Sequence, residues 1–268
     1  MSEIIGILGC GWLGTPLAVE LLTEGYAVSG TTTSEDKLYS LSKKDINTYL
    51  IQLHQDGIEG DIESFLDKIN TLIINIPPNL RTNPKGNYVA KMAILLDVIK
   101  KSTVSNVLLI SSTSVYGDAE GKITEKTQPN PSTNSGIQLL EVESLYKNEF
   151  SLSTTIIRFG GLIGKDRHPV YHLSGKKKSN GKELVNLIHL NDCIHMIKTV
   201  IKNGYWNELF NGVYPFHPTK EDYYCEEAQK RGISSPIFNI QTKRIVKKEV
   251  HAENFNLKGH RLTTPIFS

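Results

Sequence analysis

The stretch IIGILGCGWLGTPLAVELL, residues 4–22, restricts the possible folds more than any other part of the chain. A short apolar run ends at Leu8, glycines follow at G-x-G-x-x-G spacing, and a helical pattern begins near Thr15. Between a strand and a helix, such glycines permit a tight turn, close approach of a pyrophosphate and close helix–strand packing. The helix N-terminus adds free N–H groups that attract phosphate. We therefore predict dinucleotide binding, with a tight turn that holds no ligand as the alternative, by Gly9, Cys10, Gly11, Trp12, Leu13 and Gly14.

The first 160 residues continue this alternation of strand and helix patterns. Strands are expected at 3–8, 26–32, 48–53, 71–78, 106–112 and 154–161, and helices at 15–25, 34–44, 61–70 and 87–102. The strands are continuous apolar runs, which is typical of a parallel sheet covered by helices on both faces. The pattern predicts an α/β fold with a doubly wound, mostly parallel Rossmann sheet.

The alternation becomes irregular after Gly164, where residues 165–183 form a polar stretch with little periodicity. Further on, we expect strands at 184–190 and 209–215 and helices at 191–203, capped by Asn191 or Asp192, and 219–232, capped by Thr219. We predict a Rossmann domain of residues 1–164 plus 184–215. A small substrate or cap region would comprise residues 165–183 plus 216–268.

Composition excludes several classes of function. Lys and Arg number 30 against 28 Asp and Glu, a net charge of +2 that does not indicate nucleic-acid binding. The three cysteines form no C-x-x-C pair, and no grouping of His, Asp or Glu has metal-ligand spacing, so we expect no metal site. No apolar run approaches the roughly 18 residues that span a bilayer. We expect a cytoplasmic protein that binds a small-molecule substrate and neither nucleic acid nor membrane.

The end of the second strand selects between NAD and NADP. An acid about 20 residues beyond the glycines would bind the ribose hydroxyls of NAD. Here that region reads GTTTSEDK, in which the missing acid removes repulsion against a 2′-phosphate. We favour NADP, with NAD as the alternative. The residues expected at the cofactor, besides the glycine loop, are Thr31, Thr32, Thr33 and Ser34, with Lys37 close by, and Ile76, Pro77 and Pro78 after the fourth strand.

Four later stretches occur in the order found in one enzyme superfamily. They are LLISSTSVYGD (108–118), TEKTQPNPSTNSG (124–136), IIRFGGLIGKDRHP (156–169) and VNLIHLNDCIHMI (185–197). Together with the glycine loop, they resemble the extended short-chain dehydrogenases/reductases, the NAD(P)-dependent sugar epimerases and dehydratases. The resemblance implies a polar carbonyl, alcohol or nucleotide-sugar-like substrate. It also implies a homodimer through the helices of NYVAKMAILLDVIKK and GIQLLEVESLYKNEF.

The catalytic signature of that superfamily is incomplete here. Its Ser or Thr, which polarises the substrate oxygen, corresponds to Ser112. Its Tyr and Lys, which transfer the proton, correspond to Ser135 and Leu139, so the Tyr-x-x-x-Lys pair is missing. A serine hydroxyl has no pKa near neutrality, and a leucine cannot lower one. The chain therefore resembles the atypical members, which keep the glycine loop and lose most of the active-site signature.

The remaining candidates for chemistry follow strands. Tyr116 is expected near the carboxyl ends of the strands, as a catalytic residue beside Ser112 or as a ring packed under the loop. Arg167 and His168 follow a strand in a segment that the family turns toward the substrate, so we expect them to bind substrate, with solvated loop residues as the alternative. Two functions stay open: an oxidoreductase or epimerase, and a non-catalytic dinucleotide sensor or scaffold that has lost the Tyr/Lys site.

Overall fold

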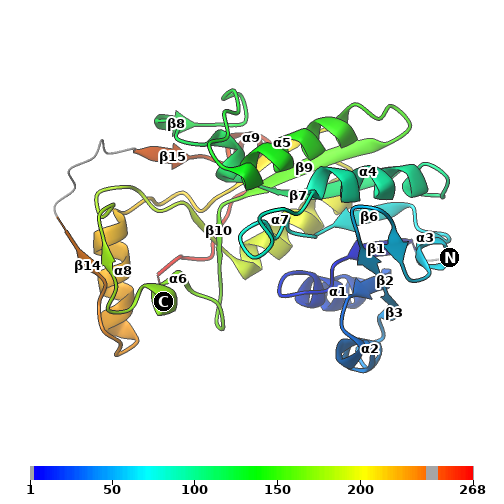
Figure 1. The fold of residues 1–268 in the computed structure, drawn as a ribbon, viewed down its shortest axis with the longest axis horizontal. Helices are drawn as coiled ribbons and strands as arrows, with labels where there is room; N and C mark the ends of the chain where they lie inside the picture. The colour runs from blue at the N-terminus through cyan, green and yellow to red at the C-terminus, as the bar shows by residue number, and fades with distance from the viewer. Residues whose placement is uncertain (1–2, 240–246, 268) are drawn as a thin grey trace.

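A seven-stranded, all-parallel sheet forms the centre of the computed structural model, which describes residues 3–239 and 247–267 (Figure 1). In spatial order its strands are β13 (Leu209–Gly212), β9 (Ser153–Phe159), β7 (Asn106–Ser112), β6 (Thr71–Ile74), β1 (Ile4–Leu8), β2 (Ala27–Thr32) and β3 (Asn47–Leu50). The chain reverses direction across the sheet between β1 and β6, as in a doubly wound Rossmann fold. The predicted α/β class is confirmed.

Helices cover both faces of this sheet (Figure 1). One face carries α3 (Ile62–Leu66), α4 (Tyr88–Ile99) and α5 (Asn134–Lys147), and the other carries α1 (Gly14–Thr23), α2 (Glu35–Ser42) and α7 (Leu190–Asn203). Successive side chains of β7 point to opposite faces of the sheet. Val107 and Leu109 pack toward α4, while Leu108 packs toward α1. This two-sided burial explains why the strands are continuously apolar.

A smaller lobe follows the sheet, with its own apolar cluster around Val170, Tyr223 and Ile266. Its helices are α6 (Pro169–Leu173) and α8 (Lys220–Lys230), and its short strands are β10 (Gly161–Ile163), β11 (Lys177–Lys178), β12 (Leu187–His189) and β14 (Ile237–Phe238). Other short elements are β4 (Gln52–Leu53), β5 (Ile58–Glu59), η1 (Thr113–Tyr116), β8 (Gly121–Ile123), β15 (Lys248–Val250) and α9 (Glu253–Leu257).

The predicted domain boundary places α9 in the cap region, but α9 packs on the sheet. Phe255 of α9 is fully buried, and its ring lies edge-on to that of Phe210 in β13, with 6.1 Å between centroids. The terminal segment is also tied to α7, because the Asp192 carboxylate accepts hydrogen bonds from the Thr263 and Thr264 amides. Residues 1–2, 240–246 and 268 of the predicted domains lie outside the described residues.

Local differences from the predicted elements have physical causes. The expected cap of α7 by Asn191 or Asp192 is wrong: the His189 side chain accepts from the Asn191 amide. Ser34 stands at the N-cap of α2 without a side-chain cap, and its amide donates to Thr32 Oγ1 instead. Thr219 caps α8 as expected.

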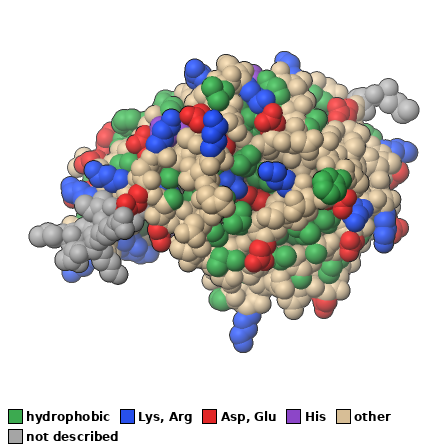
Figure 2. All heavy atoms as spheres, turned by 90° about the horizontal axis from the view of Figure 1, so that it is seen from above, with side chains coloured by type: hydrophobic (Ala, Val, Ile, Leu, Met, Phe, Trp, Pro, Cys, Tyr) green, Lys and Arg blue, Asp and Glu red, His purple; other side chains and the backbone are tan. Residues whose placement is uncertain are grey.

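Charged side chains of both signs are interspersed with apolar and uncharged ones on the face shown in Figure 2. Within residues 3–239 and 247–267, no helix is both long and apolar enough to cross a membrane.

A buried ion pair joins α5 to the sheet. Arg158 of β9 and Glu143 of α5 are 5% and 3% exposed, and Arg158 Nη2 lies 2.5 Å from Glu143 Oε2. Ser111 of β7 donates its hydroxyl to the same carboxylate at 2.5 Å, and the guanidinium lies over the Tyr116 ring. Removing one charge would leave the other unpaired in a low-dielectric core, which is more costly than removing both.

We expect Arg158→Met to lower the free energy of unfolding by about 3–5 kcal/mol. The double variant Arg158→Met/Glu143→Leu should lose less than Arg158→Met alone, because no uncompensated charge remains buried. Urea unfolding of the single and double variants measures both values. Equal or additive losses would show that the pairing does not carry this stability.

Candidate functional site

A cavity of about 670 Å³ lies at the carboxyl ends of β1, β2, β6 and β7. Leu8, Thr32 and Ser112 end three of these strands, and Asn75 follows the fourth. Ligands of doubly wound folds bind where neighbouring connections leave opposite faces of the sheet. Here that point lies between β1 and β6, so the cavity occupies the position that the topology provides for a ligand.

The glycine loop between β1 and α1 is held by both neighbouring strands. The Gly9 amide donates to Thr31 Oγ1 at 3.0 Å, and the Cys10 amide donates to the Thr31 carbonyl at 2.7 Å. From the other side, Asn75 Nδ2 donates to the Gly9 carbonyl at 3.1 Å. Asn75 was missed from the sequence, although its place directly after a buried strand was an available signal.

Glycine is needed at positions 14 and 11 of the loop for different structural reasons. A Cβ on Gly14 would lie 2.2 Å from the Gly9 carbonyl oxygen, so this position requires the close packing that only glycine allows. A Cβ on Gly11 would meet nothing within 4 Å, because it would point into open space beside the cavity. The second glycine therefore leaves room for a ligand, whereas the third lets α1 pack against the loop.

Most residues predicted to bind the cofactor line the cavity. They are Gly9, Cys10, Gly11, Trp12, Leu13, Thr31, Thr32, Thr33, Ile76, Pro77 and Pro78. Gly14 and Ser34 are not among the lining residues. Burial raises the pKa of the Cys10 thiol to about 12, so this cysteine is not a nucleophile near neutrality.

The charges that line the cavity are all positive. Lys37, Lys91 and Arg167 contribute to its wall, whereas none of the described lining residues is an aspartate or a glutamate. Lys37 belongs to α2 near the end of β2, and the Arg167 guanidinium lies 5.0 Å from the centre of the Trp12 ring. Lys91 was missed, because nothing in the sequence distinguishes it from other lysines on a helix. The cavity suits a ligand with several negative charges.

The structure separates the two predicted catalytic residues. Ser112 lines the cavity, and its Oγ accepts from the Ser114 amide at 3.1 Å. Tyr116 is fully buried outside the lining, and its hydroxyl donates to Asn211 Oδ1 at 2.9 Å. Burial raises the pKa of this phenol. The ring therefore packs under the loop, as the second of the two interpretations of Tyr116 expected.

Helix α5, to which the resemblance assigns the Tyr and Lys positions, contributes an apolar wall. Leu139 of α5 lines the cavity and is 6% exposed, while Ser135 is not among the lining residues. Ser111, which also lines the cavity, is bonded to Glu143, one turn beyond Leu139. This side of the cavity thus presents a hydroxyl and a leucine.

His168 lies away from the cavity, in the small lobe, although it was predicted to bind substrate. Its Nδ1 accepts from the Val170 amide at 3.2 Å and caps α6, while Nε2 lies 2.8 Å from the Tyr223 hydroxyl. Tyr223 donates its own proton to the Ile266 carbonyl, so His168 Nε2 is the donor to Tyr223. Burial, with a smaller effect of the Arg231 charge, lowers the pKa of His168 to about 4. This neutral histidine has a structural role.

Comparisons with known proteins agree with this architecture. The family described as "NAD dependent epimerase/dehydratase family" matches residues 5–211. The chain is 33% identical over 237 residues to Protein YeeZ of Escherichia coli K12, covering 87% of this chain and 86% of that protein. UDP-glucuronic acid 4-epimerase from Bacillus cereus, solved with UDP-glucuronic acid and NAD, superposes with a TM-score of 0.80 at 18% identity. That superposition covers 98% of this chain and 95% of the epimerase.

The neutral His168 predicts a pH-dependent stability. The unfolded chain takes up this proton near pH 6.5 and the folded chain only near pH 4, so stability is complete above 6.5 and falls as the pH drops through this window. We expect a loss of up to about 3 kcal/mol from this one group. Urea unfolding between pH 7 and pH 4 should show a shallower decline for His168→Gln than for the wild type. The exposed His172 is the control, since His172→Gln should keep the wild-type slope; parallel curves for all three proteins would contradict the assignment.

Proposed function

Because the chain belongs to the NAD-dependent epimerase/dehydratase family, we propose that its cavity binds a nicotinamide dinucleotide, NADP(H) in preference to NAD(H). This membership confirms the resemblance inferred from the sequence. The observation that carries the proposal is the glycine loop, which Thr31 and Asn75 hold beside a cavity with positive and no negative lining charge. The free space next to Gly11 is where a pyrophosphate would approach the backbone.

The preference for NADP(H) is supported by the end of β2. Thr32 and Thr33 line the cavity there, and Lys37 lies on the helix that follows. The described lining residues include no carboxylate that could bind the ribose hydroxyls of NAD. Hydroxyls and an ammonium are donors to a 2′-phosphate, and hydrogen bonds between charged groups are about twice as strong as neutral ones. Lys37 would therefore be the residue that distinguishes the two dinucleotides.

We further propose that the protein is an oxidoreductase-type enzyme for a small, polar and anionic carbonyl or alcohol. When bound, a nicotinamide supplies or accepts a hydride. Ser112 Oγ uses a lone pair for the Ser114 amide, so its O–H can donate to a substrate oxygen. Lys91 and Arg167 would attract an anionic substrate group, and nucleotide sugars are one class that carries such charge. With Ser135 and Leu139 in place of Tyr and Lys, the proton would come from water or from another residue of the cavity.

A second candidate function is a non-catalytic dinucleotide sensor or scaffold, favoured by one observation. Leu139 is part of the cavity wall, so the cation that would activate a phenol is replaced by an apolar side chain. Such a protein would bind the dinucleotide and change its assembly or partner affinity without turnover.

Binding measurements with NADPH and NADH test the first proposal. We expect NADPH to bind at least about tenfold more tightly, which corresponds to about 1.4 kcal/mol, and Lys37→Ala to remove most of that difference. Lys44→Ala, an exposed lysine just beyond the same helix, should change neither affinity. Gly11→Ala should weaken both dinucleotides without changing the melting temperature of the ligand-free protein. If neither dinucleotide bound, the tight turn without ligand would be correct. Equal binding insensitive to Lys37→Ala would contradict the preference for NADP, and tighter binding of NADH would favour NAD.

Turnover distinguishes an enzyme from a sensor. NADPH oxidation is followed with a panel of carbonyl substrates that includes nucleotide sugars. For an active substrate, we expect Ser112→Ala to lower kcat about a hundredfold, the usual effect of removing one donor to a developing oxyanion. Ser114→Ala keeps the backbone amide and should retain most of the activity. Tight dinucleotide binding with no turnover of any substrate would favour the sensor.

A further inference from the structure

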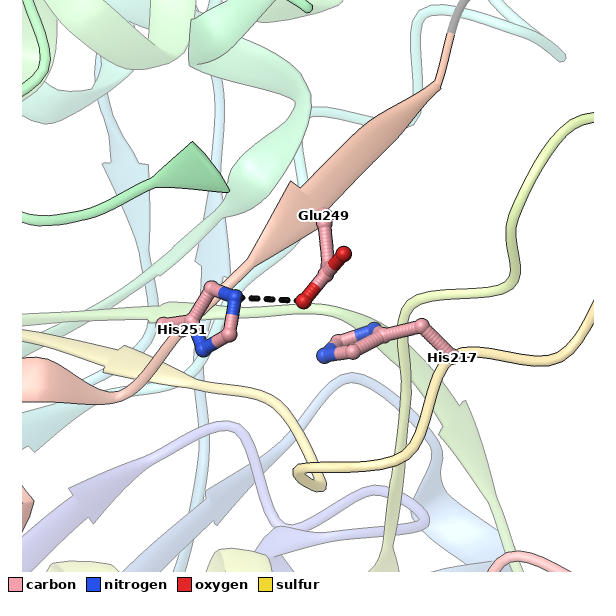
Figure 3. A group of neighbouring side chains, drawn as sticks. All are labelled: His217, Glu249 and His251. Carbon is pink, nitrogen blue, oxygen red and sulfur yellow. Dashed lines mark hydrogen bonds and ion pairs between the residues drawn. The ribbon is translucent and has the colours of Figure 1, made fainter. Parts of the chain in front are cut away.

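Three potential metal ligands meet outside the cavity, between the small lobe and the strand β15. His217, Glu249 and His251 each offer a ligand atom, and these atoms lie within 4.8 Å of one another. Figure 3 shows the Glu249 carboxylate between the two imidazole rings, with a nitrogen of each ring facing the shared space. His251 Nε2 lies 2.8 Å from Glu249 Oε1, and the centroids of the two rings are 5.4 Å apart. None of the three residues lines the dinucleotide cavity.

His217 has the protonation pattern of a metal ligand. Its Nδ1 lies 3.2 Å from the Val185 carbonyl oxygen, which can only accept, so Nδ1 carries the proton. Nε2 is consequently an unprotonated lone pair, and it is buried without a hydrogen-bond partner among the described residues. A buried polar atom without a partner is costly. Metal-binding histidines commonly have this arrangement, in which the second nitrogen donates to a carbonyl and orients the ring.

The backbone that carries the other two ligands is fixed from both sides. β15 pairs with β8 along Lys248–Val250. On its other side, Asn186 Nδ2 donates to the Lys248 carbonyl and Asn186 Oδ1 accepts from the Val250 amide, both at 2.8 Å. The His251 amide donates to the Ile123 carbonyl at 2.8 Å. Glu249 and His251 are therefore presented by a rigid frame, two residues apart on the same side of an extended segment.

We propose that His217, Glu249 and His251 form a binding site for a divalent transition metal, with Zn²⁺ as the ion that fits this donor set. Two neutral imidazoles and one carboxylate are a recurrent zinc ligand set, which leaves a fourth position for water. Zn–N and Zn–O distances of about 2.0–2.2 Å require the three ligand atoms to close in by small side-chain rotations. Glu249 and His251 have side-chain exposures of 44% and 28%, so the ion has access from solvent.

The metal would join parts of the chain that are distant in sequence. His217 lies two residues before Thr219, the N-cap of α8, while Glu249 and His251 belong to the segment that leads into α9. Because α8 belongs to the small lobe and α9 packs on the main sheet, a shared ion would stabilise the position of the lobe. In the sequence these three residues show no metal-ligand spacing, because His217 lies 32 residues before Glu249 (249 − 217).

Metal titration of the untagged full chain, first stripped with a chelator, tests this proposal. We expect the wild type to bind one Zn²⁺ per chain with a rise in melting temperature that the chelator reverses. Mg²⁺ should have no effect, since it prefers oxygen ligands. His217→Gln and His251→Gln should each weaken Zn²⁺ binding by at least about tenfold. Co²⁺ should give the visible absorption of a low-symmetry site in the wild type and lose it in both variants.

The matched control is His54, which pairs with Glu59 at 3.5 Å on the surface and has no third ligand among the described residues. His54→Gln should bind Zn²⁺ like the wild type. Melting temperatures in chelator show whether each variant is folded, and Glu249→Gln, which keeps the side-chain shape, provides a further test if a histidine variant does not fold. Absence of stoichiometric Zn²⁺ binding, unchanged affinity in the folded variants, or an equal loss in His54→Gln would overturn the proposal.

Discussion

The carbonyl oxygen of Gly9 is the point on which the arrangement of β1, α1 and β6 depends. It accepts hydrogen bonds from the Gly11 amide at 2.9 Å and from Asn75 Nδ2 at 3.1 Å. The same oxygen lies where a side chain on Gly14 would have to be placed. The loop can therefore close only with glycine at the third position. Its closure directs the N-terminus of α1 toward the cavity, where free amides would attract an anionic ligand.

The parts of the fold that could be predicted are those determined by local sequence. Buried parallel strands need continuous apolar runs, and tight strand–helix turns need glycine, so the sheet and the loop were recognisable from residues 4–22 onward. Helix caps were less predictable, because several polar residues compete at each terminus. At α7, His189 rather than Asn191 or Asp192 supplies the cap, and the Asp192 carboxylate instead anchors the chain near Thr264.

The residues that could not be predicted are those whose neighbours come from other helices and strands. Arg158 and Glu143 look like ordinary charged residues in sequence, yet both are nearly inaccessible, since each compensates the buried charge of the other. Tyr116 was placed at the correct strand end, but the direction of its side chain depends on Asn211 of β13. His168 was placed in the correct segment, and its partner Tyr223 follows 55 residues later. Spacing along the chain contains no information on such contacts.

The charged residues that line the cavity differ from the residues predicted to take part in proton transfer. Its positive charge comes from Lys37, Lys91 and Arg167, which favours anionic ligands whatever reaction follows. On α5, a lysine at the position of Leu139 would lie one turn before Glu143 and could pair with that carboxylate, but Arg158 already neutralises it. Leu139 therefore leaves no charge unpaired. Without a cation at this position, a tyrosine at 135 would keep a pKa near 10 and could not ionise near neutrality. A leucine at 139 and a serine at 135 are thus chemically consistent with each other, and Ser112 is the predicted catalytic residue that lines the cavity.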